Sequence, residues 1–193
     1  LHDVIRSRRT CILSLFAALR LPREILFGKG QRHALPAVAG KLGTRALIVT
    51  DSRFAATPVF AEMVDAVKAA GIAVLVHDQV LPDVPRDTVA VCAEAARAFA
   101  PDMVIGIGGG SCLDMAKCTA LLLSHGGALP DYYGEFKVPS PVLPIIAVPT
   151  TAGTGSEVTP VAVISDPDRT LKVGISSPYL IATVAICDPE LTM

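Results

Sequence analysis

Short apolar runs alternate with longer segments of helical spacing along most of the chain, and this alternation restricts the possible folds most strongly. The run "ALIVT" at 46–50 is continuous and β-branched, which is typical of a strand buried on both faces. The predicted strands are 46–50, 72–76, 103–107, 144–148 and 183–187, and the predicted helices are 57–70, 86–100 and 113–124. Elements in this order predict an α/β fold with a parallel sheet and helices on both faces.

The alternation ends after Thr159, where two apolar segments follow each other without a helix between them. Segments 161–165 and 171–175, separated by "DPDR", predict a small β-hairpin. We therefore expect a single α/β domain over residues 21–193. In such a sheet, ligands bind outside the carboxyl ends of the strands.

Residues 6–19, "RSRRTCILSLFAAL", place arginines before an apolar stretch, as a secretion signal does. The apolar part is far shorter than the roughly 20 residues that span a membrane, and no A-x-A-like cleavage site follows it. We expect residues 1–20 to be a short amphipathic or disordered leader, with no membrane partner.

The composition restricts the partners and the compartment. The formal net charge is −1, which argues against nucleic acid or an acidic membrane surface as a partner. The five cysteines form no CxxC pair and show no disulfide-like spacing. We expect them to be free thiols in a reducing compartment, the cytoplasm.

Three consecutive glycines, Gly108, Gly109 and Gly110, stand between the predicted strand at 103–107 and the predicted helix at 113–124. The start of a helix presents unpaired N–H groups and a partial positive charge, and missing Cβ atoms let a phosphate approach the backbone. A tight turn that needs positive φ is the alternative, although one glycine would satisfy it. The dinucleotide fingerprint lacks its last glycine here, and a Walker A Lys-Ser/Thr pair is absent. We predict a pyrophosphate cradle.

The residues after the glycines suggest how the helix begins. Ser111 is a good N-cap, and Asp114 three residues later completes an S-x-x-D pattern that resembles a capping box. Asp114 and Lys117 also have the i,i+3 spacing of a helical ion pair.

A second polar stretch, "PTTAGTGSEVTP" at 149–160, follows the strand at 144–148. Its hydroxyl groups and accessible amides suit phosphate and ribose oxygens, although such loops often satisfy their own backbone instead. Asp51 ends the first strand, where a carboxylate can accept hydrogen bonds from a ribose diol or can cap the segment that follows. Because this acid precedes the glycines, the arrangement differs from an ordinary Rossmann fold.

The histidines give no sign of a metal site. They stand at positions 2, 33, 77 and 125, and no two of them are three or four residues apart. We expect each to be a surface or loop residue, and we predict no metal ligands and no catalytic residues in this chain.

Taken together, the motifs resemble the iron-containing (group III) alcohol dehydrogenase family. The resemblance rests on "GGGSCLDMAK" (108–117), "PTTAGTGSEVTP" (149–160), "VTD" (49–51) and "DPELT" (188–192), with "LPREILFGKG" (21–30) resembling the family's first strand. It implies a Rossmann-like NAD(P)-binding domain. The family's helical C-terminal half, which carries iron or zinc on one aspartate and three histidines, would lie beyond residue 193.

The resemblance also implies a role for each matched residue. The pyrophosphate would be held by Gly108, Gly109, Gly110 and Ser111, and the path toward the nicotinamide would be lined by Thr150, Thr151, Thr154 and Thr159. Asp51 would bind the adenosine ribose, which favours NAD over NADP. Asp83 would lie near the adenosine, and Lys172 would lie near the nicotinamide ribose. Asp114 belongs to the same cofactor-binding set, where its main role would be to hold the structure of the site.

The leading hypothesis is the NAD-binding domain of a dehydrogenase that moves a hydride between a small primary alcohol or polyol and NAD. The expected partners are an alcohol or aldehyde substrate and further copies of the chain, with Fe²⁺ or Zn²⁺ only in a full-length family member. The fragment alone is expected to be inactive. A relative of maleylacetate reductase or glycerol dehydrogenase is the alternative among enzymes, and a stand-alone, non-catalytic nucleotide-binding module is the alternative outside them.

Overall fold

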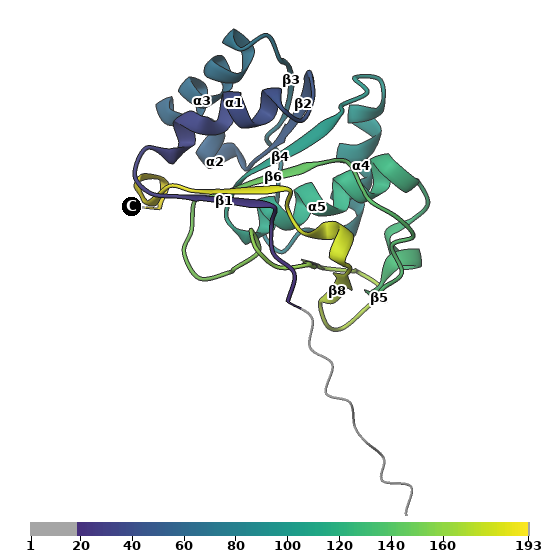
Figure 1. Ribbon diagram of the computed structural model, residues 1–193. Coiled ribbons are helices and arrows are strands. Elements are labelled where there is room, and N and C mark those ends of the chain that lie inside the picture. Colours follow the sequence, from purple (N-terminus) through teal and green to yellow (C-terminus); the bar gives the residue numbers. More distant parts are fainter. Residues whose placement is uncertain (1–18, 193) are drawn as a thin grey trace, which may run out of the picture.

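The computed structural model describes residues 19–192 and contains a six-stranded parallel sheet in the order β1-β9-β6-β4-β2-β3 (Figure 1). The strands are β1 (Glu24–Phe27), β2 (Arg45–Val49), β3 (Ala73–His77), β4 (Met103–Gly108), β6 (Ile145–Pro149) and β9 (Val184–Cys187). Every strand predicted from the apolar runs is present, and all neighbours pair in parallel. The predicted α/β fold class is confirmed.

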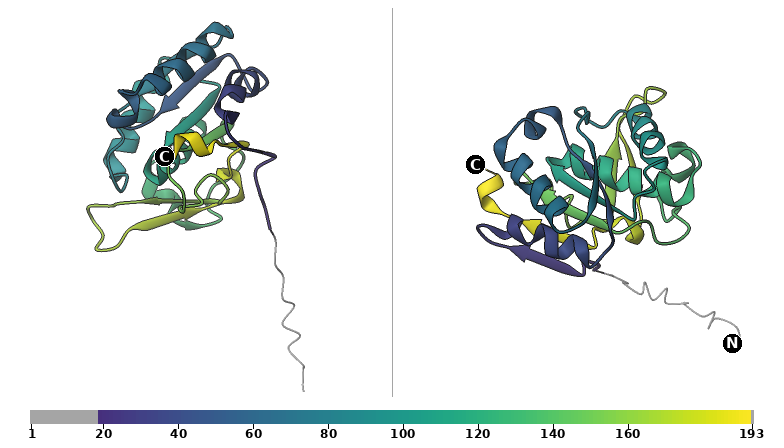
Figure 2. Two further views of the ribbon diagram at one scale, coloured as in Figure 1. Left: turned by 90° about the vertical axis from the view of Figure 1, so that its left-hand side faces the viewer. Right: turned by 90° about the horizontal axis from the view of Figure 1, so that it is seen from above.

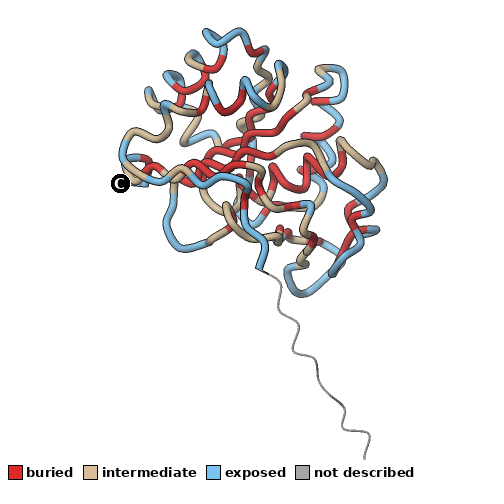
Figure 3. The backbone as a smooth tube through the Cα atoms, viewed as in Figure 1, coloured by how far each residue is buried: buried red, intermediate tan, exposed pale blue. Residues whose placement is uncertain are grey.

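Helices cover both faces of this sheet, as Figures 1 and 2 show. One face carries α1 (Leu35–Gly40) and α3 (Pro58–Ala69), and the other carries α4 (Arg86–Arg97) and α5 (Gly110–His125). The short helix α2 (Ser52–Ala55) follows β2 directly. Buried side chains form one hydrophobic cluster on each side of the sheet, and the central strands β4 and β6 are buried along their whole length (Figure 3).

Local sequence explains where the best-defined helix begins and ends. Thr57 caps α3 by accepting a hydrogen bond from the backbone N–H of Phe60, and Pro58 occupies the first helical position. Gly71 follows the helix with φ 83°, a conformation that glycine adopts without strain. The predicted helix at 57–70 therefore has both of its ends specified in the sequence.

The predicted hairpin is confirmed and belongs to a second, smaller sheet. Strands β7 (Val161–Ile164) and β8 (Val173–Ser176) pair antiparallel, and the two-residue strand β5 (Gly134–Glu135) extends them in the order β5-β8-β7. Ala162, Ile164 and Ile175 bury their side chains in the cluster that α4 and α5 share. The small sheet is thus packed on the α5 side of the main sheet.

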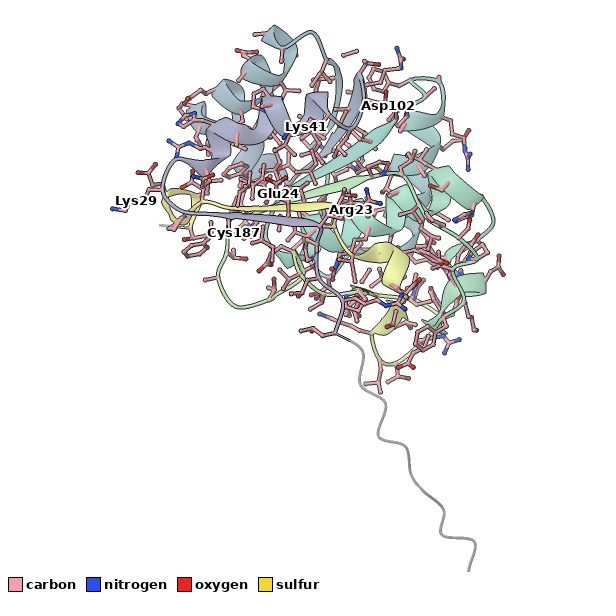
Figure 4. The ribbon with its side chains drawn as sticks, viewed as in Figure 1. Arg23, Glu24, Lys29, Lys41, Asp102 and Cys187 are labelled. Carbon is pink, nitrogen blue, oxygen red and sulfur yellow. The ribbon has the colours of Figure 1, made fainter. Side chains whose placement is uncertain are left out.

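Asp188, in the motif "DPELT" after β9, connects the last part of the domain to the residues that follow β1. Its carboxylate accepts hydrogen bonds from the backbone N–H groups of Gly30 and Arg32, each at 3.1 Å, and from Arg32 Nη1 at 2.9 Å. Burial alone would raise the pKa of Asp188, but these hydrogen bonds outweigh it and hold the pKa below its ordinary value. Figure 4 shows Lys29, which follows β1, at one end of the sheet and Asp102, which precedes β4, at the opposite end.

Most of the predicted leader lies outside the described residues, since only Leu19 and Arg20 of it are placed. Within residues 19–192, no helix has both the length and the apolar character needed to span a membrane. The four cysteines of this part of the chain are free thiols, and Cys92, Cys112 and Cys118 are buried.

Candidate functional site

The three polar motifs meet at the carboxyl ends of β2, β4 and β6. Val49 at the end of β2 is paired with Gly106 of β4, and Gly108 at the end of β4 is paired with Pro149 of β6. The strand order also reverses here, because the chain leaves β2 for β3 on one side and returns to β4 on the other. Ligands of open α/β sheets bind at such a switch point.

Gly108 is required by the fold itself. Its φ of +147° is rarely adopted by residues with a side chain, and a Cβ at this position would lie 2.5 Å from Cys112 Sγ. Cys112 is buried directly beneath the turn, and burial, followed by the charge of Asp51, raises the pKa of its thiol to about 12. This thiol therefore packs beneath the turn and stays protonated and unreactive at neutral pH.

Gly109 is different, because the backbone does not require a glycine there. Its φ of −71° and ψ of −178° suit any residue. A Cβ would come no closer than 3.4 Å to a neighbouring atom, Thr151 Oγ1. The missing side chain of Gly109 leaves open the approach to the first turn of α5, where backbone N–H groups have no intrahelical partner.

Gly110 is the first residue of α5 and faces the second polar loop. A Cβ there would lie 3.0 Å from Thr154 Cγ2, so the loop packs closely on the glycine turn. A hydrogen bond also holds the start of the 149–160 loop on the glycine turn, since Thr150 N donates to Gly108 O at 2.9 Å. The predicted association of these two motifs is thus present in the structure.

The predicted capping roles of Ser111 and Asp114 are wrong. The N-cap of α5 is Gly109, with no side-chain cap, so Ser111 already lies inside the helix. Its Oγ accepts instead from the backbone N–H of Asp83 at 3.3 Å. Asp114 accepts from Ser156 Oγ at 2.6 Å and from Val163 N at 3.0 Å. The S-x-x-D spacing mimics a capping box, but both side chains connect α5 to other segments.

Asp51 caps α2, which is the alternative role that its sequence position allows. One carboxylate oxygen, Oδ1, accepts from Arg53 N at 3.0 Å and from Phe54 N at 3.1 Å. The other, Oδ2, lies 3.8 Å from where a Cβ of Gly108 would be, and 3.7 Å from Cys112 Sγ. The cap thus leaves a second oxygen beside the glycine turn.

Asp83 lies in a strained loop that reaches the same site. Asp83 and Val84 have φ of +63° and +48°, an uncommon region for residues with a side chain. The loop is held by Ser165 N, which lies 3.0 Å from Asp83 O and 3.1 Å from Val84 O. Strained backbone of this kind persists only where surrounding contacts fix it, and it occurs often at binding sites.

A cavity of about 360 Å³ lies between α5, the 149–160 loop and the small sheet. Its lining includes seven of the residues predicted from the sequence: Asp83, Gly110, Ser111, Asp114, Thr154, Thr159 and Lys172. The other five do not line the cavity but lie around the glycine turn that adjoins Gly110, which we call its rim: Asp51, Gly108, Gly109, Thr150 and Thr151. We call this cavity and its rim the cofactor cleft.

The sequence indicates only a helical ion pair between Lys117 and Asp114, but the Lys117 side chain is completely buried in the middle of α5. Its Nζ donates to Ser156 Oγ at 3.1 Å, to Thr159 O at 3.0 Å and to Val161 O at 2.7 Å. Burial lowers its pKa to about 8, while the nearby Asp114 carboxylate acts in the opposite direction. The predicted i,i+3 pair with Asp114 exists, with 3.9 Å between Nζ and Oδ1.

The histidines occupy separate parts of the described chain. His33 lies in an exposed 3₁₀ turn, and His125 ends α5 with its Nε2 3.1 Å from Ser140 O. His77 is not a loop residue, since it ends β3 half-buried, and burial lowers its pKa. Within residues 19–192, no three His, Cys, Asp or Glu side chains come together in a way that could hold a metal ion. These residues therefore do not fit a metal centre.

Comparison with known proteins decides the family. Residues 22–189 match the family model described as iron-containing alcohol dehydrogenase. The chain belongs to this family.

Individual members of the iron-containing alcohol dehydrogenase family extend well beyond this chain. Sulfoacetaldehyde reductase of Bilophila wadsworthia is 38% identical over 171 residues, which are 88% of this chain and 44% of that protein. A crystal structure of 1,3-propanediol oxidoreductase superposes with a TM-score of 0.88 at 30% identity, over 91% of this chain and 46% of the other. Sulfoacetaldehyde reductase of Bifidobacterium kashiwanohense, solved in complex with NAD⁺, gives 0.81 at 34% identity, over 92% and 47%. The chain thus spans less than half the length of these relatives.

Proposed function

We propose that residues 21–193 bind NAD in the cofactor cleft, as the dinucleotide-binding domain of a dehydrogenase. Gly109 is the observation that carries this proposal. Its backbone conformation and its surroundings would both accept a side chain, so the glycine serves something other than the fold. An anionic group seated on the first turn of α5 explains why no side chain stands there.

The described residues fit such a ligand. The backbone N–H groups from Gly109 to Ser111 would bind the pyrophosphate, and Asp51 Oδ2, which already accepts from Cys112 Sγ, would also accept from a ribose hydroxyl. Thr154 and Thr159 line the cleft toward Lys172, which would donate to the second ribose. When bound, the nicotinamide ring supplies the hydride acceptor, which no side chain can replace.

For the full-length protein, we propose hydride transfer between a small primary alcohol or polyol and NAD. The family match and the names of the relatives support this class of reaction. The described residues provide NAD contacts but no fit for a metal, so we propose that the 193-residue chain alone is inactive. The four free cysteines among residues 19–192 suit the cytoplasm. Edge strand β1 exposes 77% of Phe27, which suits self-association.

Titration of the chain with NADH by calorimetry tests the binding proposal. We expect one saturable site, with NAD⁺ and NADH competing for it and with NADP⁺ binding more weakly. An absence of binding by all of these cofactors up to millimolar concentration would overturn the proposal. Light scattering of the same sample tests self-association separately. A monomer that binds NADH would contradict self-association and leave the binding proposal standing.

A further inference from the structure

Arg53 lies beside the carboxylate that would bind the adenosine ribose. It is the second residue of α2, two positions after Asp51, and its Nε lies 3.4 Å from Asp51 Oδ1. The Arg53 side chain is 92% exposed, so the ion pair is largely in solvent and contributes little to the stability of the fold. A guanidinium is thus present at the cofactor cleft without a structural need for it.

Most of the hydrogen-bonding capacity of Arg53 is unused. A guanidinium carries five N–H donors in a fixed, planar arrangement. Among the described residues 19–192, Nε of Arg53 has an acceptor but its two Nη atoms have none, so their N–H donors face solvent. Two parallel donors of this kind can bind two oxygens of one phosphate group. Arg53 therefore offers a phosphate site for which no protein group competes strongly.

The cap of α2 does not depend on the Arg53 side chain. Asp51 Oδ1 accepts from the backbone N–H groups of Arg53 and Phe54, and these hydrogen bonds need no particular side chain at position 53. The guanidinium can therefore leave Oδ1 without disturbing the start of the helix.

The charges around the ribose decide which dinucleotides fit there. A carboxylate that accepts from a ribose hydroxyl repels a 2′-phosphate, whereas an arginine nearby accommodates that phosphate. This chain carries both groups at the end of β2. Asp51 Oδ2 faces the glycine turn, where a ribose would bind, and Arg53 lies on the Oδ1 side of the same carboxylate. A 2′-phosphate on that ribose would come within reach of the long, exposed Arg53 side chain.

We propose that Arg53 forms a subsite for the 2′-phosphate of NADP, so that the cofactor cleft takes NADP as a second, weaker dinucleotide. This inference rests on the proposed binding of NAD. Asp51 disfavours the 2′-phosphate, and Arg53 offsets part of that effect by moving from Asp51 Oδ1 to the phosphate. The offset amounts to about three- to fivefold in affinity, as expected for one exposed ion pair.

The test compares Arg53→Met with wild type by calorimetric titration. NADH and NADPH are titrated as whole cofactors, and adenosine 5′-phosphate and adenosine 2′,5′-bisphosphate as probes of the ribose subsite alone. We expect Arg53→Met to bind the two 2′-phosphorylated ligands about three- to fivefold more weakly, and the other two within about twofold of wild type. Arg53→Lys should retain only part of the wild-type affinity for NADPH, because lysine lacks the paired donors.

Arg97→Met is the matched control. Arg97 also pairs with a nearby acid, Glu94 at 2.9 Å, but it lies near the end of α4 and does not line the cleft. Its replacement should change none of these affinities. Salt gives a second readout: in Arg53→Met the preference for NADH over NADPH should shrink as salt is raised, because the repulsion by Asp51 is then screened without an opposing attraction.

Unchanged NADPH affinity in Arg53→Met would overturn the 2′-phosphate subsite. So would a wild-type protein that binds NADH but shows no binding of NADPH up to millimolar concentration. If wild type binds neither cofactor, the proposed function fails instead.

Discussion

Lys172 and Asp83, separated by 89 positions in the sequence, meet at the cofactor cleft with 2.5 Å between Nζ and Oδ1. Both side chains are more than half exposed, so this ion pair adds little to the stability of the fold. Its position matters more, because it joins the strained 81–85 loop to strand β8 and its neighbouring turn beside a cavity lined by hydroxyl groups.

Asp83→Asn should therefore raise the affinity for NADH. The change removes a negative charge from the cleft and releases the Lys172 ammonium, so we expect a roughly two- to fivefold gain, comparable to the energy of one exposed ion pair. Lys172→Met should lower the affinity at least as much. Calorimetry at two salt concentrations checks both variants, because the differences must shrink as salt screens the charges. A weaker-binding Asp83→Asn would show that the carboxylate itself contacts the ligand.

The glycines should respond differently to alanine. Gly109→Ala should fold with a stability within about 1 kcal/mol of wild type and lose most of its NADH affinity, because the new methyl group obstructs the first turn of α5. Gly108→Ala should lose about 1–3 kcal/mol of unfolding free energy, since its Cβ would overlap Cys112. Denaturant melts and calorimetry on the same samples separate the two effects. Normal NADH binding by Gly109→Ala would remove the observation that carries the proposed function.

Asp51 should set the preference for NAD over NADP, because its carboxylate charge would repel a 2′-phosphate. Asp51→Ser tests this best, since serine can cap α2 without a negative charge, while losing the contacts that the carboxylate makes with Cys112 Sγ and Arg53 Nε. We expect a wild-type preference for NAD of about tenfold, and nearly equal affinities in the variant. Asp51→Gly should also relax the preference, while losing the side-chain cap of α2. Competitive titration with both cofactors measures the ratio, and a preference unchanged in Asp51→Ser would limit Asp51 to capping.

Asp188 should make the domain sensitive to acid. Its pKa in the folded state lies below that of the unfolded chain, so its contribution to stability is complete above about pH 4, where an unfolded carboxyl is ionised. The contribution is lost as the pH falls through the lower, folded-state pKa. Asp188→Asn should lower the free energy of unfolding by about 2 kcal/mol at pH 7, because the Arg32 guanidinium loses its buried carboxylate partner. The difference from wild type should shrink below pH 4, as urea melts at several pH values would reveal.

The fold could be predicted from the sequence wherever one local signal decides the structure. A β-branched apolar run such as 46–50 favours a buried strand in an α/β protein. Thr57 and Pro58 mark the start of a helix, and Gly71 marks its end. The short helix α1 lacks such a pattern and is stabilised by burying Leu35, Val38 and Ala39, whereas the two-residue strand β5 is exposed and is defined by its pairing with β8. The strand order depends on contacts between distant segments, which no local window contains.

The candidate site follows the same division. The glycines after β4 could be singled out from the sequence because three in a row suggest a chemical purpose, whereas the contacts of buried polar side chains could not. The spacing of Ser111 and Asp114 suggested a cap, because a local pattern cannot show that Asp83, Ser156 and Val163 compete for these side chains. The burial of Lys117 was not predicted for a related reason: a lysine on a helix is usually solvated, and only the packed structure reveals three acceptors around it.

The 193-residue chain should bind no catalytic metal and show no alcohol dehydrogenase activity. Hydride transfer needs an alcohol that is deprotonated, or nearly so, beside the nicotinamide, and a metal that achieves this takes three or four protein ligands that converge on one point. His33, His77 and His125 lie on separate elements, and no metal-binding group forms among residues 19–192. Elemental analysis after incubation with Fe²⁺ or Zn²⁺, with an NAD-linked assay over several primary alcohols and polyols, measures both properties. NADH binding without turnover is the expected result. Stoichiometric metal together with NAD-dependent turnover would show that these 193 residues are a complete catalyst.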